Sequence, residues 1–201
     1  MSMNEYERNS TKDDVLVKAF QEGDMAAFDQ LVIRHKESIF NLCYWFLGDY
    51  QDANDYAQET FIKVYRSLKR FRGEAAFSTW LYRIAVNTCK NRLKSVEHRY
   101  KQKTISLDNP DCEGVVLEVR DESQKPNGVL EGKQLMLHIR EAINGLPRDQ
   151  KTVIVLRDIQ GLSYEEIIRI TGLPLGTVKS KIARARQELR RKLRSVIKDG
   201  V

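Results

Sequence analysis

The chain has 201 residues, of which 31% are charged, and its mean hydropathy is −0.51. It contains no run of about 18 apolar residues, so we expect no transmembrane helix and no direct membrane insertion. The polar start MSMNEYERNSTKDD lacks the basic and apolar segments of a signal peptide, which predicts a cytoplasmic protein.

The N-terminal part is predicted to form four helices. Apolar residues recur at spacings of three and four from 14 to 47, with a break at Glu22-Gly23-Asp24 and a stop at Gly48. A third helix is expected over about 52–68, with Asp52 as its N-cap. After a turn at 71–73, Ser78 or Thr79 is expected to cap a fourth helix, which reaches residue 94 or beyond.

The segment 96–132 differs in composition. It is rich in turn-forming residues and carries a net charge of −3, from 5 basic and 8 acidic residues. Such a composition favours a flexible linker over a long loop inside one domain. We therefore expect an all-α protein with two small helical domains, 1–95 and 133–201, joined by the linker 96–132.

The C-terminal part is predicted to contain a helix-turn-helix. A helix over 135–143 is followed by one that starts with Pro147 at its first position and stops near Gly161. Ser163 and Glu166 form a capping box for a helix over 164–171, which Gly172 ends. A short turn then leads into a long helix over about 177–197, and a helix pair of this kind is typical of DNA-binding domains.

The long helix has one apolar stripe and otherwise basic faces. Val178, Ile182, Ala185 and Leu189 are expected to be buried. Residues 133–201 carry a net charge of +8, against +1 for residues 1–95, so the positive charge is concentrated at the end expected to meet a polyanion. A membrane surface would also attract this charge, so charge alone does not choose between the two partners. The first turns of such a helix read base edges in the major groove, which nominates Thr177, Lys179, Ser180, Lys181 and Arg184. A solvated basic face on an ordinary helical hairpin is the alternative.

Two further patterns lie in the N-terminal part. The segment 71–92 places aromatic rings beside basic groups, which suits single-stranded nucleic acid, and Asn87 adds a side chain that can read a base edge. Trp80 can equally be a core residue. On the preceding helix Asp52, Asp55 and Glu59 share one face, flanked by Gln58, and this face either docks a protein partner or is simply solvated.

Groups for catalysis or metal binding do not cluster in the sequence. The three cysteines form no C-x-x-C pair and are expected to be buried or incidental thiols: Cys43, Cys89 and Cys112. The three histidines are scattered, and no phosphate-binding glycine-rich loop is present. We therefore expect no cofactor, no metal site, no catalytic residue and no enzymatic activity.

Three motifs in the order found here resemble extracytoplasmic-function sigma factors, and the envelope-stress sigma factor of enteric bacteria is especially similar. These are DANDYAQETF at 52–61, FRGEAAFSTWLYRIAVN at 71–87, and GLSYEEI at 161–167 with GTVKS at 176–180. The resemblance implies a factor that binds core RNA polymerase and directs promoter-specific initiation. An anti-sigma factor is an implied partner.

The resemblance also implies a role for each site. Asp52, Asp55, Gln58 and Glu59 would bind the clamp coiled coil of polymerase, and the C-terminal domain would sit on the polymerase flap. The −10 element and a flipped base of the non-template strand would be held by Phe71, Arg72, Gly73, Glu74, Phe77, Trp80 and Asn87. The helix with Lys179 to Arg184 would read the −35 duplex. A dimeric helix-turn-helix repressor or activator is the rival hypothesis, and it gives segment 71–80 no role.

Overall fold

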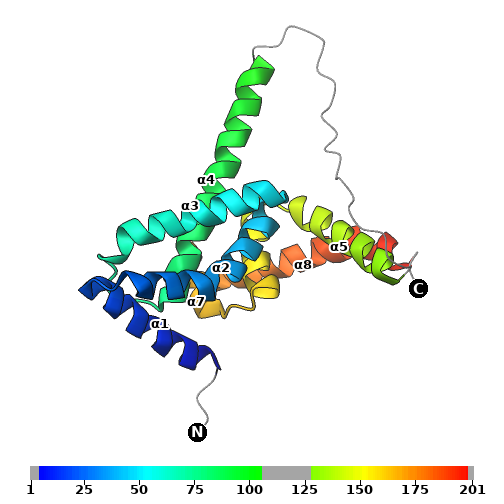
Figure 1. Ribbon diagram of the computed structural model, residues 1–201. Coiled ribbons are helices and arrows are strands. Elements are labelled where there is room, and N and C mark those ends of the chain that lie inside the picture. Colours follow the sequence, from blue (N-terminus) through cyan, green and yellow to red (C-terminus); the bar gives the residue numbers. More distant parts are fainter. Residues whose placement is uncertain (1–4, 106–127, 199–201) are drawn as a thin grey trace.

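The computed structural model describes residues 5–105 and 128–198, and side chains over 12–95 and 134–194. Within these ranges every regular element is a helix, as expected (Figure 1). None of these helices is long and apolar enough to span a membrane.

The first two helices form an antiparallel pair. α1 (Glu5–Glu22) and α2 (Met25–Leu47) are separated at Gly23, whose φ of 113° suits glycine alone. Asp24 caps α2 by accepting the Ala26 N–H at 2.9 Å, and Gly48 ends α2 in the left-handed conformation, as predicted. The buried Asp13 of α1 accepts hydrogen bonds from Arg34 and from His35 on α2, which fixes the two helices together.

The next two helices begin elsewhere than predicted. α3 (Tyr50–Leu68) is capped by Asp49, which accepts the Asp52 N–H at 2.8 Å, so Asp52 is inside the helix and is not its N-cap. Two carboxylates three residues apart both satisfy the capping pattern, and the earlier one is used. α4 (Phe77–Ile105) begins before Ser78 and Thr79, so neither caps it.

The described part of the C-terminal half, 128–198, forms five helical elements. α5 (Gly128–Asn144) precedes α6 (Arg148–Ile154). Pro147 was predicted as the first residue of its helix, but it is the N-cap, and α6 begins one residue later at Arg148. α6 is followed directly by a π-helical turn, η1 (Val155–Ile159). The spacing of apolar residues in the sequence did not predict this turn. α7 (Tyr164–Thr171) and α8 (Leu175–Lys198) follow, with α8 starting two residues earlier than expected.

The predicted linker 96–132 is helical at both ends. Residues 96–105 continue α4 and residues 128–132 belong to α5, while 106–127 lie outside the described residues. Cys112 falls in this undescribed segment.

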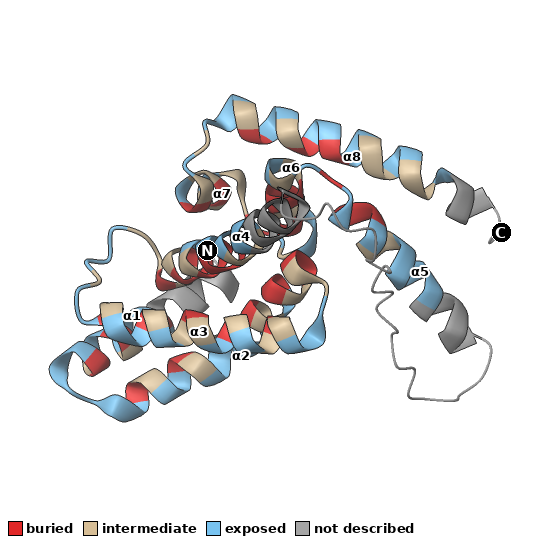
Figure 2. Cartoon of the chain, turned by 90° about the horizontal axis from the view of Figure 1, so that it is seen from above, coloured by how far each residue is buried: buried red, intermediate tan, exposed pale blue. Residues whose placement is uncertain are grey.

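The two halves, α1–α4 and α5–α8, pack directly against each other. Phe46 and Leu81 of the first half share one buried apolar cluster with Val155, Leu156 and Ile167 of the second. Figure 2 shows α6 and α7 between α4 and the outer helix α8, with buried residues facing inward. The sequence predicted two helical domains but not this contact between them.

Candidate nucleic-acid interface

The helix-turn-helix is built as the sequence predicted. The Ser163 side chain accepts the Glu166 N–H at 3.2 Å, and the Glu166 carboxylate accepts the Ser163 N–H at 2.8 Å, so the capping box is complete. Gly172, with φ 72°, ends α7 and turns the chain toward α8. Val178, Ile182 and Ala185 are buried, which fixes α8 by one face and leaves its other faces outward (Figure 2).

The five residues nominated on α8 are not equally available. Lys179, Ser180 and Arg184 are exposed, and Thr177 is half-buried. Lys181 Nζ lies 3.0 Å from Asp149 Oδ2 on α6, and this hydrogen bond lowers the pKa of the Asp149 carboxyl. Lys181 therefore exchanges an existing partner if it binds a phosphate or base, whereas Arg184 has no ion pair within the described residues.

Part of the basic face serves the fold. The Arg186 guanidinium donates two hydrogen bonds to Asp158 of η1, at 3.0 and 2.6 Å. Lys192 Nζ donates to the Gly145 carbonyl oxygen at 2.9 Å, which joins α8 to the turn after α5. These contacts show that a charge count over α8 overstates the number of cations open to a polyanion.

The turn between α3 and α4 carries the aromatic cluster. Gln21 Nε2 donates to the carbonyl oxygens of Leu68 and Phe71, at 3.1 and 2.9 Å, and so anchors the turn to α1. The centroids of the Phe71 and Trp80 rings lie 4.8 Å apart, and both side chains are partly exposed. Phe77 is only 1% exposed and contacts both rings from the core side, so it supports them and is not itself open to a base.

A cavity of about 440 Å³ opens beside this cluster. Its lining combines aromatic, basic and small polar groups: Ser67, Arg70, Phe71, Arg72, Glu74, Ala75, Thr79, Trp80, Arg83 and Arg169. Trp80, Arg83 and Asn87 share a face of α4 at spacings of three and four, and Asn87 is exposed. Rings for stacking and guanidinium groups for phosphates therefore meet at one opening, and the Asn87 amide lies outside its lining, one turn further along the same face of α4. Sequence reasoning missed Arg169, because it comes from α7 in the other half.

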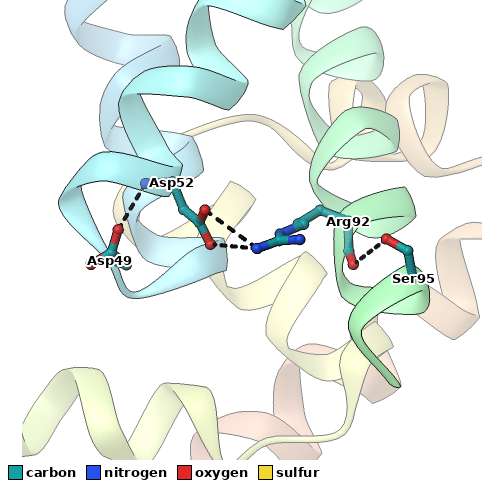
Figure 3. Close-up of polar contacts among 4 residues, drawn as sticks. All are labelled: Asp49, Asp52, Arg92 and Ser95. Carbon is teal, nitrogen blue, oxygen red and sulfur yellow. Dashed lines mark hydrogen bonds and ion pairs between the residues drawn. The ribbon is translucent and has the colours of Figure 1, made fainter. Parts of the chain in front are cut away.

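The acidic face of α3 combines free and paired groups. Asp55 and Gln58 are exposed. Arg92 Nη2 of α4 lies 3.4 Å from Asp52 Oδ2, and Figure 3 shows the two side chains pointing toward each other. Lys63 Nζ lies 2.7 Å from Glu59 Oε1. The Arg92 guanidinium also lies 5.7 Å from the centre of the Tyr56 ring.

A second hollow, of about 570 Å³, lies between this face and α2. Its lining is mixed polar and apolar: Val32, Lys36, Glu37, Phe40, Asn41, Asn54, Ala57, Gln58 and Phe61. The α2 side chains were not nominated from the sequence, since only their position across from α3 marks them. Together the hollow and the acidic face make a surface suited to a protein helix.

The thiols and histidines form no reactive centre in the described residues. Cys43 and Cys89 are buried, as expected, with their Sγ atoms 3.6 Å apart. The hydrogen bond between them and their burial raise the pKa of the Cys89 thiol, which disfavours the reactive thiolate. No group of three or more potential metal ligands occurs among the residues described.

Comparison with known proteins gives one consistent family. Residues 31–99 match the Sigma-70 region 2 model, and residues 136–189 match the Sigma-70 region 4 model. The ECF RNA polymerase sigma-E factor of Haemophilus influenzae is 40% identical over 185 residues, covering 92% of this chain and 97% of that protein.

Two solved structures share the fold. One is CnrH in complex with the cytosolic domain of CnrY, with a TM-score of 0.67, 23% identity, and coverage of 92% of this chain and 98% of that one. The other is the sigma factor RpoE of Bartonella quintana in complex with the anti-sigma factor NepR, with a TM-score of 0.60, 23% identity, and coverage of 83% and 96%. The chain belongs to the extracytoplasmic-function sigma factors, and it is an alternative sigma factor that directs promoter-specific transcription.

Proposed function

We propose that the chain divides promoter recognition between three surfaces: the α3 face for core polymerase, the α4 cavity for the −10 element, and α8 for the −35 element. The observation that carries this proposal is the meeting of aromatic rings and guanidinium groups at the α4 cavity, with the exposed Asn87 amide on the same face of α4. A helix-turn-helix repressor has no use for such a cavity. We keep the two domains expected at 1–95 and 133–201, and extend the first to residue 105 and the second back to residue 128 so that they include all of α4 and α5.

The polymerase surface is assigned to α3. Asp55 and Gln58 are exposed on it, and Asp52 and Glu59 are held by single ion pairs that a partner can replace. The clamp coiled coil of core polymerase would bind here, beside the hollow against α2, and the flap would receive the C-terminal half. Surface ion pairs of this kind contribute little stability, so exchanging them costs little.

The −10 surface is assigned to the cavity beside Phe71 and Trp80. A base that has left the duplex stack would enter the cavity, with Asn87 reading an edge and Arg72 and Arg83 neutralising the backbone of the non-template strand. Each stacking contact contributes about 1–3 kcal/mol in such sites, so base capture favours melting. Gly73 allows the turn its positive φ, and Phe77 supports the rings.

The −35 surface is assigned to the exposed side of α8. Lys179, Ser180 and Arg184 would contact base edges, with Thr177 and Lys181 at the margin. The chain performs no covalent chemistry in this mechanism, and polymerase makes the RNA. It would act in the cytoplasm, and an anti-sigma factor would hold it inactive. The structure of the sigma factor RpoE in complex with the anti-sigma factor NepR supports a partner of this kind.

A crossed promoter experiment tests this division. Purified core polymerase with the wild-type chain, Arg184→Ala or Asn87→Ala is offered a library randomised at the −35 and −10 elements. Arg184→Ala should relax base preference only at −35 positions, with a loss of about 1–3 kcal/mol of discrimination at the base that Arg184 contacts. Asn87→Ala should relax base preference only at −10 positions.

Arg190→Ala is the matched control for Arg184→Ala, because Arg190 is exposed one turn and a half further along α8. It should weaken all promoters alike, as loss of a phosphate contact does. Equal losses at both elements for either test variant would remove that residue from base reading.

A further inference from the structure

The end of α1 holds the turn between α3 and α4. Gln21 Nε2 of α1 donates to the Leu68 carbonyl oxygen at 3.1 Å and to the Phe71 carbonyl oxygen at 2.9 Å. Leu68 is the last residue of α3, and its carbonyl oxygen also accepts the Phe71 N–H at 3.0 Å. The Gln21 amide therefore joins the end of α3 to the residue that carries the first ring of the aromatic cluster.

A second line of contacts joins α1 to the same cluster through α2. Asp13 is 1% exposed and accepts a hydrogen bond from His35 Nε2 at 2.8 Å. The His35 and Phe77 ring centroids lie 5.5 Å apart, and Phe77 in turn contacts the Phe71 and Trp80 rings. The bond to Asp13 fixes the orientation of the imidazole ring. Because Phe77 is buried, that orientation reaches the exposed rings through closely packed groups.

Both anchors start from one face of α1. Asp13, Val17 and Gln21 recur every four residues, and Val17 between the two anchors is buried. α1 lies before residues 31–99, which match the Sigma-70 region 2 model, and none of its described residues lines the cavity beside the rings. An effect of α1 on base preference would therefore pass through the turn and the rings.

We propose that α1 is a positioning element for −10 recognition, in which Gln21 holds the turn and Asp13, through His35, holds the rings. This inference rests on the proposed function of the cavity. A recognition site discriminates well when its contacting groups are held in place by a supporting layer of hydrogen bonds and packing. Loss of either anchor lets Phe71 and Trp80 shift to accept other bases. It should therefore lower base discrimination at the −10 element and leave the −35 element unaffected.

The test uses core polymerase with the full chain. Two promoters that differ only at the most strongly selected −10 position compete for open-complex formation, and a second pair differs only at a −35 position. Gln21→Leu removes the donor at similar size and should lower the −10 ratio about 3- to 10-fold, as loss of one or two hydrogen bonds does. Gln21→Glu loses the same donor and should match it, whereas Gln21→Lys keeps a donor and should retain most of the ratio.

His35→Leu tests the second anchor, because leucine supplies neither the ring nor the hydrogen bond, while Asp13 keeps Arg34 as a partner. It should lower the −10 ratio and leave the −35 ratio and the affinity for core polymerase unchanged. Gln30→Leu is the matched control for Gln21→Leu, since Gln30 is an exposed glutamine on α2, and it should match the wild type in both ratios. Circular dichroism verifies that each variant is folded.

A merely structural role would reduce the amount of active complex and leave both ratios unchanged. That result in folded Gln21→Leu and His35→Leu, or an equal fall at the −10 and −35 pairs, overturns the positioning role. A fall in only one of the two variants supports that anchor and overturns the other. Asn87→Ala separates this failure from failure of the proposed function. If it lowers the −10 ratio, the assignment of the cavity stands, and if it does not, both the assignment and the positioning role are overturned.

Discussion

Lys151 offers a quantitative probe of the contact between the halves, because its ammonium group is buried against a carbonyl and an amide oxygen. Burial lowers the pKa of Lys151 from 10.5 to about 8. In the unfolded chain this side chain returns to water and holds its proton to higher pH. Between about pH 8 and 10.5 the unfolded chain therefore binds more protons than the folded one, so raising the pH in this window stabilises the fold through this residue.

The perturbation is Lys151→Met, which keeps an unbranched side chain of similar length and removes the titratable group. The difference in unfolding free energy, wild type minus variant, should rise by about 2 kcal/mol between pH 7 and pH 9.5. Urea denaturation followed by circular dichroism at several pH values measures this difference. The prediction concerns only how this difference changes with pH. Its value at pH 7 combines two opposing effects, because the variant no longer buries a charge but leaves the Phe46 carbonyl oxygen without its donor.

Lys18→Met is the matched control, because Lys18 is also a helical lysine but its side chain is exposed on α1. Its difference from the wild type should stay flat over the same range. A Lys151→Met difference that is also flat, or that falls as the pH rises, would refute the burial of a charged Lys151 at this interface.

Two further substitutions test other features. Asp55→Arg reverses an exposed charge on the surface assigned to polymerase, and should reduce affinity for core polymerase about tenfold or more in a fluorescence binding assay. Asp14→Arg, at an exposed position on α1, should leave this affinity unchanged, and equal affinities for the two variants would remove α3 from the interface. Ser163→Ala removes the N-cap of α7 and should lower the unfolding free energy by about 1 kcal/mol in urea, and an unchanged midpoint would show that the capping box contributes nothing.

Local chain chemistry explains what the sequence predicted well. Gly48 and Gly172 end their helices because positive φ is accessible to glycine, and Ser163 with Glu166 begins α7 because each satisfies the other's backbone N–H. The buried stripe of α8 follows from a spacing of four and three, which places Val178, Ile182 and Ala185 on one face. Leu189, four residues further on, was also expected to be buried and is only partly so, packed against the edge of the core.

Other features depend on groups that local pattern does not connect. Asp49 and Asp52 both fit the capping rule, and only the fold decides between them. From the sequence, Lys151 and Gln160 are expected to be ordinary surface residues, because no nearby residue indicates a partner. In the structure Lys151 bonds to the Phe46 carbonyl oxygen of α2, and Gln160 bonds to Tyr82 of α4. Arg169 lines the cavity beside Phe71 and Trp80 for the same reason, because its contact there is between segments that lie far apart along the chain.

Promoter-dependent initiation by purified core polymerase decides most directly whether this chain selects promoters through two separated elements. Run-off transcription on genomic fragments, with and without the chain, should give defined transcripts only when the chain is present. Each start site should lie downstream of a shared −35 and −10 pair, and altering either element should abolish the transcript. Tight binding of the free chain to a palindromic duplex, with no defined transcripts from core polymerase, would contradict this function and favour a repressor.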